Sequence, residues 1–576
     1  MPQPPVRDKN DARSFLPVPL LVFAVGAFTF LLYLRSAWFQ FVYDDQYQVL
    51  DEPIIHSWKF LGSYFTQAVR LTGYYRPLFT TWFRLNYWLF GQHPAGWHVT
   101  SALLNAAVAI VVFILGRALM QSNLVATVAA LLYAAHPSHI ESVAWVSGVC
   151  DVLMCLFFVA ALLAYLRAFS AHSGKPGWLA FSLLLLAAAL LSKEPAATFS
   201  GIVAFHAFLF TEGTWIRKCQ RALVFSAPYA LLTIVYLLVR KYAVSAVVPI
   251  RSSVSARTMA LTAPSLLWFY LKKLAYPTGM SLFYNETYVT SAIGVVLPLF
   301  LIVAIVTLLV VWAKYSRNDG RLILFSAAWI VITLTPVFYI RSFDSNELVH
   351  VRYLYLPSLG FCFLIALALA DVFRTRPQSF ALWSGIFVLL FSGLTLAQEG
   401  YWSRDFALFR RAVEIAPHHA AALNNLARVY VDRGQFAIAA PMLREVLATN
   451  PNSGHGVAHY NLGYIYYREG DLAAAEAELR QAVAIYSGDA FYHLYLGLTL
   501  FREGRFAEAE PEIREAIAIA PSRPGYHLAL SAVLEARGDV AGALEEARTE
   551  ATIEPGNQQI QARVQALEVE LAHEKH

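Results

Sequence analysis

Charged residues are scarce in this chain of 576 residues. Asp, Glu, Lys and Arg together make up 14% of it, whereas roughly 25% is usual in soluble globular proteins. Apolar residues account for 58%, a composition that suits hydrocarbon surroundings. The deficit excludes an ordinary soluble protein. The net charge of +5 is small for this length and spread along the chain, so we expect no nucleic-acid partner.

Cysteine is also rare, and its placement excludes a disulfide-stabilised scaffold. The chain has four cysteines, at Cys150, Cys155, Cys219 and Cys362. All of them lie inside or beside apolar runs, which is poor placement for a disulfide framework. We expect them to be packing residues.

The charge that is present is distributed unevenly, which predicts two domains. Residues 1–398 hold long apolar runs between short polar links, and residues 399–576 are rich in Glu, Arg, Ala and Gly. The first run follows basic residues as a secretory signal would, but it is longer than a signal and lacks a cleavage site. About eleven runs have the roughly 20 residues needed to cross a bilayer. They are 16–38, 97–119, 124–145, 148–169, 177–193, 195–211, 221–240, 291–313, 321–340, 353–373 and 380–398.

A twelfth candidate, residues 258–276, is interrupted by Pro264 and carries Lys272 and Lys273. We expect it to be an interfacial or re-entrant helix. With a cytoplasmic N-terminus and eleven spans, the short basic links fall on the cytoplasmic side, as the positive-inside rule requires. The loop after the first span and the C-terminal domain then share the non-cytoplasmic side.

Residues 399–576 contain an internal repeat. Gly434, Gly470, Gly504 and Gly538 recur at spacings of 36, 34 and 34 residues, each between two amphipathic stretches. This period is typical of tetratricopeptide repeats. The sequence therefore predicts an all-α protein. Its parts are a polytopic helical membrane domain at 1–398, a capping half-repeat at 399–419, a solenoid of four repeats at 420–555 and a C-terminal helix or tail at 556–576.

Asn425 and Asn461 occupy equivalent positions in successive repeats. Their amides could bind the backbone of an extended peptide through donor and acceptor together. The alternative is that both are solvated helix residues. Tyr495 and Ala529 take the equivalent places in the later repeats, so any such ladder is short.

Candidate chemistry begins directly after the first span, where Asp44 and Asp45 are adjacent. Neighbouring carboxylates repel and burial raises their pKa, so such a pair is typical of a site that handles a proton or holds a cation. A solvated loop is the alternative. Other polar residues are predicted on the same membrane face. They are Arg76, His136, His139, Glu141, Lys193, Glu194, Arg251 and Arg352.

This distribution distinguishes two classes of membrane protein. A secondary transporter is expected to place ionisable residues near the bilayer midplane, and the middles of these runs are almost free of charge. A lipid-linked substrate carries its phosphate at headgroup depth, where arginine and lysine can bind it. Charges at the edge of apolar helices are costly and usually functional. The pattern therefore favours a lipid-linked substrate.

Several short motifs, taken in order, resemble a known family. They are the acidic pair, Tyr-Arg-Pro at 75–77, His-Pro-x-His-x-Glu-x-Val at 136–143, Leu-Ser-Lys-Glu at 191–194, Arg-Tyr-Leu-Tyr-Leu-Pro at 352–357 and the trailing repeats. Together they resemble the transmembrane and tetratricopeptide-repeat-containing O-mannosyltransferases of the GT-C fold class. The resemblance covers nearly the whole chain. It implies an inverting enzyme that moves a mannose-like hexose from a polyprenyl-phosphate donor to Ser or Thr hydroxyls of an acceptor protein.

The resemblance also implies roles for the polar residues. Asp44 or Asp45 would be the general base. Arg76, Lys193, Arg352 and Arg251 would bind the leaving phosphate. His136, His139, Glu141 and Glu194 would orient donor or acceptor, although the histidines could equally be packing residues. Asn425 and Asn461 would hold the acceptor. No metal or other cofactor is expected, because arginine and lysine can neutralise a monophosphate.

Two alternatives remain open. A non-catalytic membrane scaffold that recruits envelope proteins would explain the repeats but not the polar cluster. A polymerase or ligase of lipid-linked glycans would explain both. The composition suggests a bacterial relative, with its active site and repeats in the periplasm, or in the endoplasmic reticulum lumen of a eukaryotic cell. The expected partners are the lipid-linked donor, membrane lipids and a protein or peptide in the repeat groove.

Overall fold

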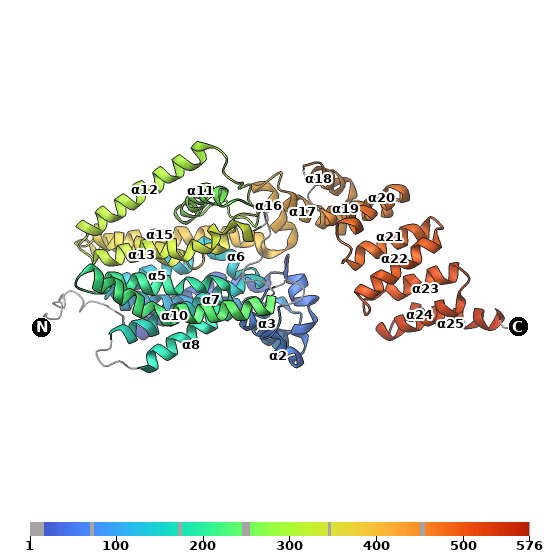
Figure 1. The fold of residues 1–576 in the computed structure, drawn as a ribbon, viewed down its shortest axis with the longest axis horizontal. Coiled ribbons are helices and arrows are strands. Elements are labelled where there is room, and N and C mark those ends of the chain that lie inside the picture. The colour runs from blue at the N-terminus through green and yellow to red at the C-terminus, as the bar shows by residue number, and fades with distance from the viewer. Residues whose placement is uncertain are drawn as a thin grey trace. The chain divides into compact units, whose positions relative to one another are not determined.

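The chain folds into two helical units (Figure 1). The computed structural model describes residues 16–68, 74–170, 176–244, 254–343, 347–449 and 455–574. Contacts divide the chain into Met1–Ile415, which holds the apolar helices, and Ala416–His576, which holds the repeats.

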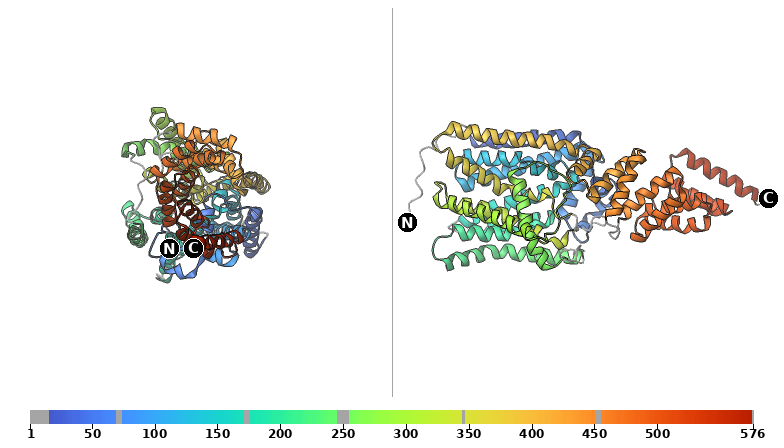
Figure 2. Two further views of the ribbon diagram at one scale, coloured as in Figure 1. Left: turned by 90° about the vertical axis from the view of Figure 1, so that its right-hand side faces the viewer. Right: turned by 90° about the horizontal axis from the view of Figure 1, so that it is seen from above.

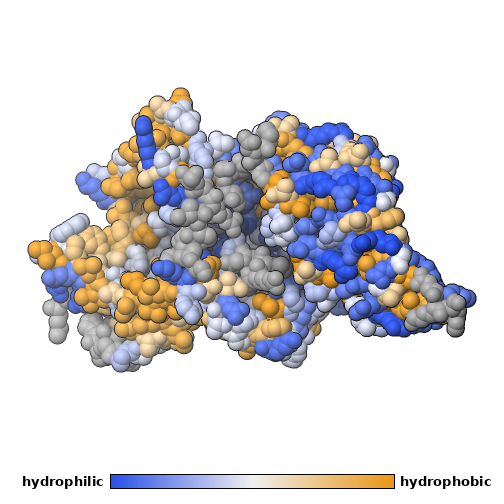
Figure 3. All heavy atoms as spheres, turned by 45° about the vertical axis from the view of Figure 1, so that its right-hand side comes forward, coloured by the Kyte–Doolittle hydropathy of each residue, from blue (hydrophilic) through white to orange (hydrophobic). Residues whose placement is uncertain are grey.

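The first unit is built from the following principal helices, many of which run along a common direction (Figure 2). They are α1 (Val18–Tyr33), α3 (Pro77–Phe90), α4 (Pro94–Met120), α5 (Asn123–Ala135), α7 (Val149–Ser170), α8 (Pro176–Ser192), α9 (Phe199–Phe210), α10 (Trp215–Val244), α11 (Ala256–Ala275), α12 (Ala292–Tyr315), α13 (Gly320–Leu334), α14 (Ser358–Val372), α15 (Pro377–Glu399) and α16 (Asp405–Ile415). Hydrophobic residues cover much of this unit in the space-filling view (Figure 3). On α12, for example, Phe300 and Leu308 are exposed, as expected of side chains that face lipid.

The membrane helices agree with the predicted apolar runs. Among the described residues, seven helical stretches are long and apolar enough to cross a membrane, and four shorter apolar helices accompany them. The seven are Val18–Trp38, Pro94–Met120, Val146–Phe169, Trp215–Val244, Ala292–Tyr315, Gly320–Phe338 and Pro377–Ser403, and the four are Asn123–Ala135, Pro176–Ser192, Glu194–Phe210 and Ser358–Val372. Each predicted run coincides with one of these eleven. The chain is an integral membrane protein, and the twelfth candidate, α11, is not among these segments.

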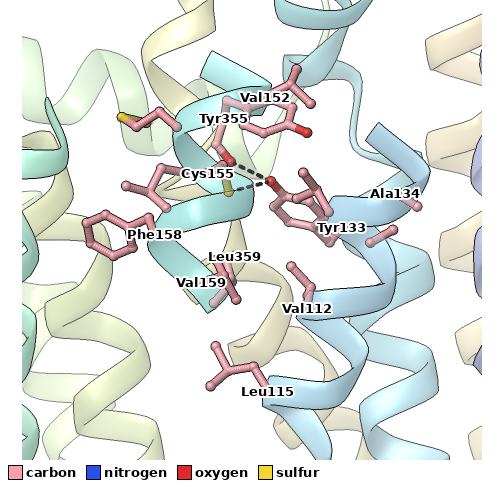
Figure 4. Packing of buried hydrophobic residues seen from close by; sticks show 14 of the residues in the cluster. Val112, Leu115, Tyr133, Ala134, Val152, Cys155, Phe158, Val159, Tyr355 and Leu359 are labelled. Carbon is pink, nitrogen blue, oxygen red and sulfur yellow. Dashed lines mark hydrogen bonds between the residues drawn. The ribbon is translucent and has the colours of Figure 1, made fainter. Parts of the chain in front are cut away.

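The core of the first unit lies where α4, α5, α7 and α14 pack (Figure 4). The Tyr133 hydroxyl donates to the Tyr355 carbonyl at 3.2 Å and lies 3.4 Å from Cys155 Sγ. The Tyr355 hydroxyl donates to Asn105 Oδ1 at 2.6 Å. Both tyrosine hydroxyls thus have a partner, which removes most of the cost of burying them. The cysteines are free thiols and three of them are buried, as predicted for packing residues.

Prolines end several helices and create the polar loops between them. The residue before a proline avoids the helical conformation, and α5 accordingly ends just before His136-Pro137 and α8 just before Lys193-Glu194-Pro195. Pro336 follows α13, and Pro357 precedes α14. Pro195, Pro336 and Pro357 line one cavity, so three of these breaks lie together in space.

The second unit is a row of helix pairs followed by one more helix. The pairs are α17 and α18 (Ala420–Asp432, Phe436–Thr449), α19 and α20 (Gly456–Glu469, Leu472–Ile485), α21 and α22 (Ala490–Arg502, Phe506–Ile519) and α23 and α24 (Tyr526–Ala536, Val540–Ile553), followed by α25 (Gln558–Glu574). Gly470 turns between its two helices with φ of 89°, a conformation that favours glycine. A Cβ on Gly497 would come within 2.5 Å of Ile513, so the paired helices need a small residue there. The tetratricopeptide fold is confirmed.

The half-repeat that was expected to cap the repeats belongs to the first unit. The contact boundary falls after Ile415, not near Gln398. On α16, Leu408, Phe409 and Ala412 are buried, and the Phe409 ring lies 5.9 Å from the ring of Tyr43. The apolar face of α16 therefore packs beside the loop that carries Asp44.

Candidate functional site

Asp45 is a structural carboxylate. It is fully buried, and its oxygens accept hydrogen bonds from Val42 N at 3.2 Å, Ser147 N at 2.8 Å and Ser147 Oγ at 2.6 Å. Burial raises the pKa of Asp45 to about 7, and the hydrogen bonds from Ser147 and Val42 act in the opposite direction. Asp45 thus ties the loop after α1 to the segment that begins α7.

Asp44 differs from its neighbour in exposure and in hydrogen bonding. It is half-buried, and its carboxylate accepts no hydrogen bond from any residue in the described ranges. Burial raises the pKa of Asp44 to about 6, and the nearby positive charge of Arg352 lowers it. A group with this pKa is mostly ionised at neutral pH and can still accept a proton effectively. Asp44 is therefore the better candidate for a general base.

The turn before Asp44 is strained. Tyr43 has φ of 55°, which is costly for a bulky side chain. Asp405, the first residue of α16, accepts hydrogen bonds from Tyr43 N at 2.8 Å and Gln46 Nε2 at 3.3 Å. The Tyr43 ring packs against Trp145, Phe283 and Phe409. Contacts on both sides of Asp44 therefore hold it in place.

Arg352 is the positive charge that lowers the pKa of Asp44. Glu141 fixes the orientation of Arg352. Arg352 Nη1 lies 3.0 Å from Glu141 Oε1, and its backbone N–H donates to Glu141 Oε2 at 3.0 Å. Nε and Nη2 make no hydrogen bond to the part of the chain that the structure describes. The guanidinium lies 5.2 Å from the centre of the Trp145 ring. The indole N–H of Trp145 is buried and has no partner among the described residues.

The other predicted phosphate ligands already have carboxylate partners. Lys193 Nζ contacts both oxygens of Asp151 at 2.6 and 2.7 Å, and the two side chains are only 5% and 4% exposed. Arg76 binds Glu194 through Nε and Nη2, and Arg240 Nη2 lies 3.6 Å from the same carboxylate. Lys193, Arg76 and Glu194 therefore form structural ion pairs. Arg251 lies outside the described residues.

The two histidines are held by hydrogen bonds inside the protein. Both are fully buried. His136 Nδ1 lies 2.8 Å from Ser138 Oγ and its Nε2 3.0 Å from the Leu274 carbonyl, and His139 Nε2 lies 2.7 Å from Ser358 Oγ. An orienting role toward donor or acceptor stays a prediction for them. No group of three His, Cys, Asp or Glu side chains in the described ranges is placed to hold a metal.

Two cavities adjoin these charges. One includes Gln48, Tyr74 and Arg76 in its wall. The other is lined by Asp151, Arg352 and Tyr353 and by apolar residues of the proline-broken segments. The Asp44 loop reaches the first cavity through Gln48, and Arg352 lines the second.

The two asparagines predicted to bind a peptide also make hydrogen bonds within the array, and their peptide-binding role stays a prediction. Asn425 Nδ2 donates to the Ala421 carbonyl of its own helix at 2.8 Å. Asn461 is 3% exposed, and its amide lies 3.4 Å from Asn424 Oδ1. Both amides are therefore used inside the array.

Sequence reasoning missed three residues of the membrane cluster. Asp151 forms an ion pair with Lys193, and Arg240 shares the Glu194 carboxylate with Arg76. Trp145 carries the buried indole N–H that has no partner among the described residues. A charge inside or at the end of an apolar run was the signal for the first two. Trp145 stands in the segment that contains both histidines, but no pattern indicated its role.

Together, fold and site define a polytopic helical membrane protein with a polar cluster at or near the ends of its apolar helices and a tetratricopeptide array. Comparison with known proteins agrees. Residues 75–240 match the family described as dolichyl-phosphate-mannose-protein mannosyltransferase, and residues 424–490 and 493–557 match tetratricopeptide repeats. The chain is similar to protein O-mannosyl-transferase TMTC3 of Homo sapiens, at 25% identity over 79% of this chain and 54% of that protein.

Other relatives carry the same name. Protein O-mannosyl-transferase TMTC4 of Homo sapiens is 26% identical over 73% of this chain and 65% of its own length. Tmtc1 of Drosophila melanogaster is 33% identical over 30% of this chain and 21% of its own length. The resemblance read from the motifs is thus confirmed: the chain is similar to the TMTC O-mannosyl-transferases, with a mannosyltransferase match in its membrane domain and tetratricopeptide repeats after it. It spans about half the length of the first of these relatives.

Proposed function

We propose that the protein is an inverting membrane glycosyltransferase. It transfers a mannose-like hexose from a polyprenyl-phosphate donor to a Ser or Thr hydroxyl of an acceptor protein. The observation that carries this proposal is Asp44, a half-buried carboxylate without a hydrogen-bond partner among the described residues, beside the positive charge of Arg352. The similarity to named O-mannosyl-transferases supports the choice of sugar and acceptor.

The transfer is a single displacement. Asp44 accepts the proton of the acceptor hydroxyl, and the hydroxyl oxygen forms a bond to the anomeric carbon. The bond from that carbon to the phosphate oxygen breaks, and the lipid phosphate leaves with the bonding electron pair. The configuration at the anomeric carbon inverts.

Arg352 is the residue we assign to the leaving phosphate. Its Nε and Nη2 are available for bonding, and Glu141 fixes its orientation from the other side. A cation that is already in place where charge develops lowers the barrier without reorganisation. Because Arg352 supplies this charge, the proposal requires no metal. The apolar cavity wall of Pro195, Val337 and Leu356 suits the first isoprene units of the donor.

The aromatic residues around Asp44 suit a sugar. Trp145 offers an indole N–H that lacks a partner in the described residues, and a sugar hydroxyl can accept from it. Tyr43 and Trp145 lie 5.8 Å apart between ring centres. Aromatic rings with a polar tip bind ligands that are partly apolar and partly hydroxylated.

The proposed sidedness rests on eleven spans and a cytoplasmic N-terminus. We propose that the Asp44 loop and the repeats face the non-cytoplasmic side, which is the periplasm if the source is bacterial. Cysteines placed at Gln48 and Gly556 should then react with an impermeant reagent from the same side of the membrane. Labelling from opposite sides would overturn this topology.

The function itself is tested with the purified full-length protein. Incubation with polyprenyl-phosphate mannose and a Ser/Thr-rich peptide should add one hexose to the peptide, detected by mass spectrometry. Nucleotide-linked mannose should give no product. A folded protein that transfers no hexose from any polyprenyl-phosphate donor would contradict the proposal and favour the non-catalytic scaffold.

A further inference from the structure

The first helices of the second and third repeats carry a surface of tyrosines and arginines. We define the tyrosine–arginine surface as Tyr464, Tyr467, Tyr495, Arg468, Arg502 and Arg523. The helices α19 and α21 that supply most of it are in contact, as are α21 and α23. The ring of Tyr495 lies 5.0 Å from Tyr464 and 5.6 Å from Tyr467. The rings therefore form one continuous patch, and all of them are partly exposed.

The arginines of this surface are exposed and bind aromatic groups rather than acids. Arg502 lies 4.8 Å from the Tyr467 ring centre, and Arg523 lies 4.1 Å from that of Phe491. Arg468 Nη1 donates to the Tyr464 hydroxyl at 2.6 Å. None of the three has an ion-pair partner within the described ranges. Asp489 acts on Arg523 only through longer-range charge, and it caps α21 by accepting from Phe491 N.

Several arginines elsewhere in the repeats form ion pairs with glutamates. Arg505 and Arg537 each contact a glutamate. So do most arginines on the second helices and on α25, namely Arg480, Arg514, Arg548 and Arg563. The lack of acids on the tyrosine–arginine surface is therefore local. The chain has 21 Asp and Glu against 13 Lys and Arg in residues 416–576, so acids are abundant in this unit but are not used here.

We propose that the tyrosine–arginine surface binds an extended peptide segment that carries carboxylates. An unpaired guanidinium can bind a carboxylate bidentately, and a positive patch selects a partner of opposite charge. Tyrosine and arginine are also the residues most enriched at energetic centres of interfaces. The excess of acids over the whole unit repels a long polyanion such as a nucleic acid and leaves a short acidic segment as the occupant.

Arg468 and Arg502 stand 34 residues apart, at equivalent positions of successive repeats. A segment that crosses both helices would meet one guanidinium from each. The binding does not depend on catalysis. If the protein has the proposed function, the acidic segment belongs to the protein that is glycosylated. In that case the acidic segment would select acceptors and hold their hydroxyls at a high effective concentration.

The test measures binding by the full-length protein in detergent micelles. Two labelled peptides of 12 residues are compared by fluorescence anisotropy. They share a Ser/Thr/Ala sequence and differ only in four positions, which are Glu in one and Gln in the other. We expect the Glu peptide to bind at least 10-fold more tightly, and added salt to weaken it because exposed charges are screened. Equal affinity for both peptides would overturn the proposal.

Variants test where the peptide binds and control for misfolding. Arg468→Gln with Arg502→Gln should weaken the Glu peptide at least 10-fold, whereas the matched pair Arg480→Gln with Arg514→Gln should change it less than 2-fold. Arg468→Glu with Arg502→Glu should lose the Glu peptide and gain a Lys peptide of the same frame, a result that an unfolded array cannot give. Equal losses in both Gln pairs would contradict the assigned surface.

Two further measurements distinguish this inference from a general polyanion site and from the proposed function. A single-stranded oligonucleotide that displaces the Glu peptide at equal concentration would mean a general polyanion site and would overturn the peptide assignment. Asp44→Asn should bind the Glu peptide like the unchanged protein. In the unchanged protein, binding of the Glu peptide without any hexose transfer would leave this inference intact while the proposed function fails, and transfer without a preference for acidic peptides would do the reverse.

Discussion

Asp405 Oδ1 accepts a hydrogen bond of 2.8 Å from the backbone N–H of Tyr43. This bond joins the first residue of α16 to the strained turn that precedes Asp44. A non-glycine residue with φ of 55° persists only where its surroundings enforce it. The chain that leads toward the repeats thus also fixes the position of the candidate base.

Replacing Asp405 with Asn should slow transfer without weakening the binding of donor. The amide keeps one acceptor oxygen but loses the charge and the second acceptor that holds Gln46. A small displacement of Asp44 should lower kcat about 10-fold, because transfer depends steeply on the position of the base, and leave KM for the donor within 2-fold. Steady-state kinetics measure both. Arg404→Gln, at the exposed neighbouring residue, is the matched control, and an equal loss in both variants would contradict the positioning role.

The pH dependence of transfer should report the ionisation of Asp44. The pKa of Asp44 is raised to about 6, so the carboxylate gains a proton, and the base is lost, as pH falls through that value. The rate should decline with decreasing pH below about 6. In Arg352→Gln the positive charge that lowers this pKa is gone, so the decline should begin at higher pH, whatever the maximal rate. Identical profiles for the two proteins would contradict the electrostatic link between the residues.

The buried Lys193 and Asp151 pair should support folding. Removing one partner leaves an uncompensated charge in a protein interior, which typically costs about 3 to 5 kcal/mol. Lys193→Met and Asp151→Asn should each lower the midpoint of thermal unfolding clearly, and the double change Lys193→Met with Asp151→Leu should recover much of the loss. Thermal unfolding in detergent would show this. Two single variants as stable as the parent would mean that the pair has no structural role.

Much of the fold could be predicted from the sequence because its signals are local. Apolar runs of sufficient length become membrane helices, and the glycine period of the repeats reports a unit that folds against its neighbours. The end of the membrane unit was harder to predict. The apolar face of α16 looks the same whether it packs on Tyr43 or on a repeat, and only the three-dimensional contacts decide.

The sequence indicated which residues lie in the candidate site, but not which of them form ion pairs with each other. Residue type and position near the end of an apolar run indicated Asp44, Arg352 and Lys193. Which carboxylate forms an ion pair with which cation depends on packing between segments far apart in the chain, as for Arg352 and Glu141. The difference between Asp44 and Asp45 arises in the same way, because Ser147, which binds only Asp45, lies about a hundred residues along the chain.

The central claim is that Asp44 is the base, and one comparison of purified variants tests it most directly. Transfer of hexose from polyprenyl-phosphate mannose to a peptide is measured for Asp44→Asn, Asp45→Asn and Asp51→Asn. Asp51 is an exposed acid on the same loop and provides the control. Asp44→Asn should lose at least about 100-fold in rate, as removal of a general base does, with an unchanged unfolding midpoint. Asp45→Asn should lower that midpoint, because its amide would face the Ser147 N–H, and Asp51→Asn should match the parent in both. Full transfer by a folded Asp44→Asn protein would contradict the account.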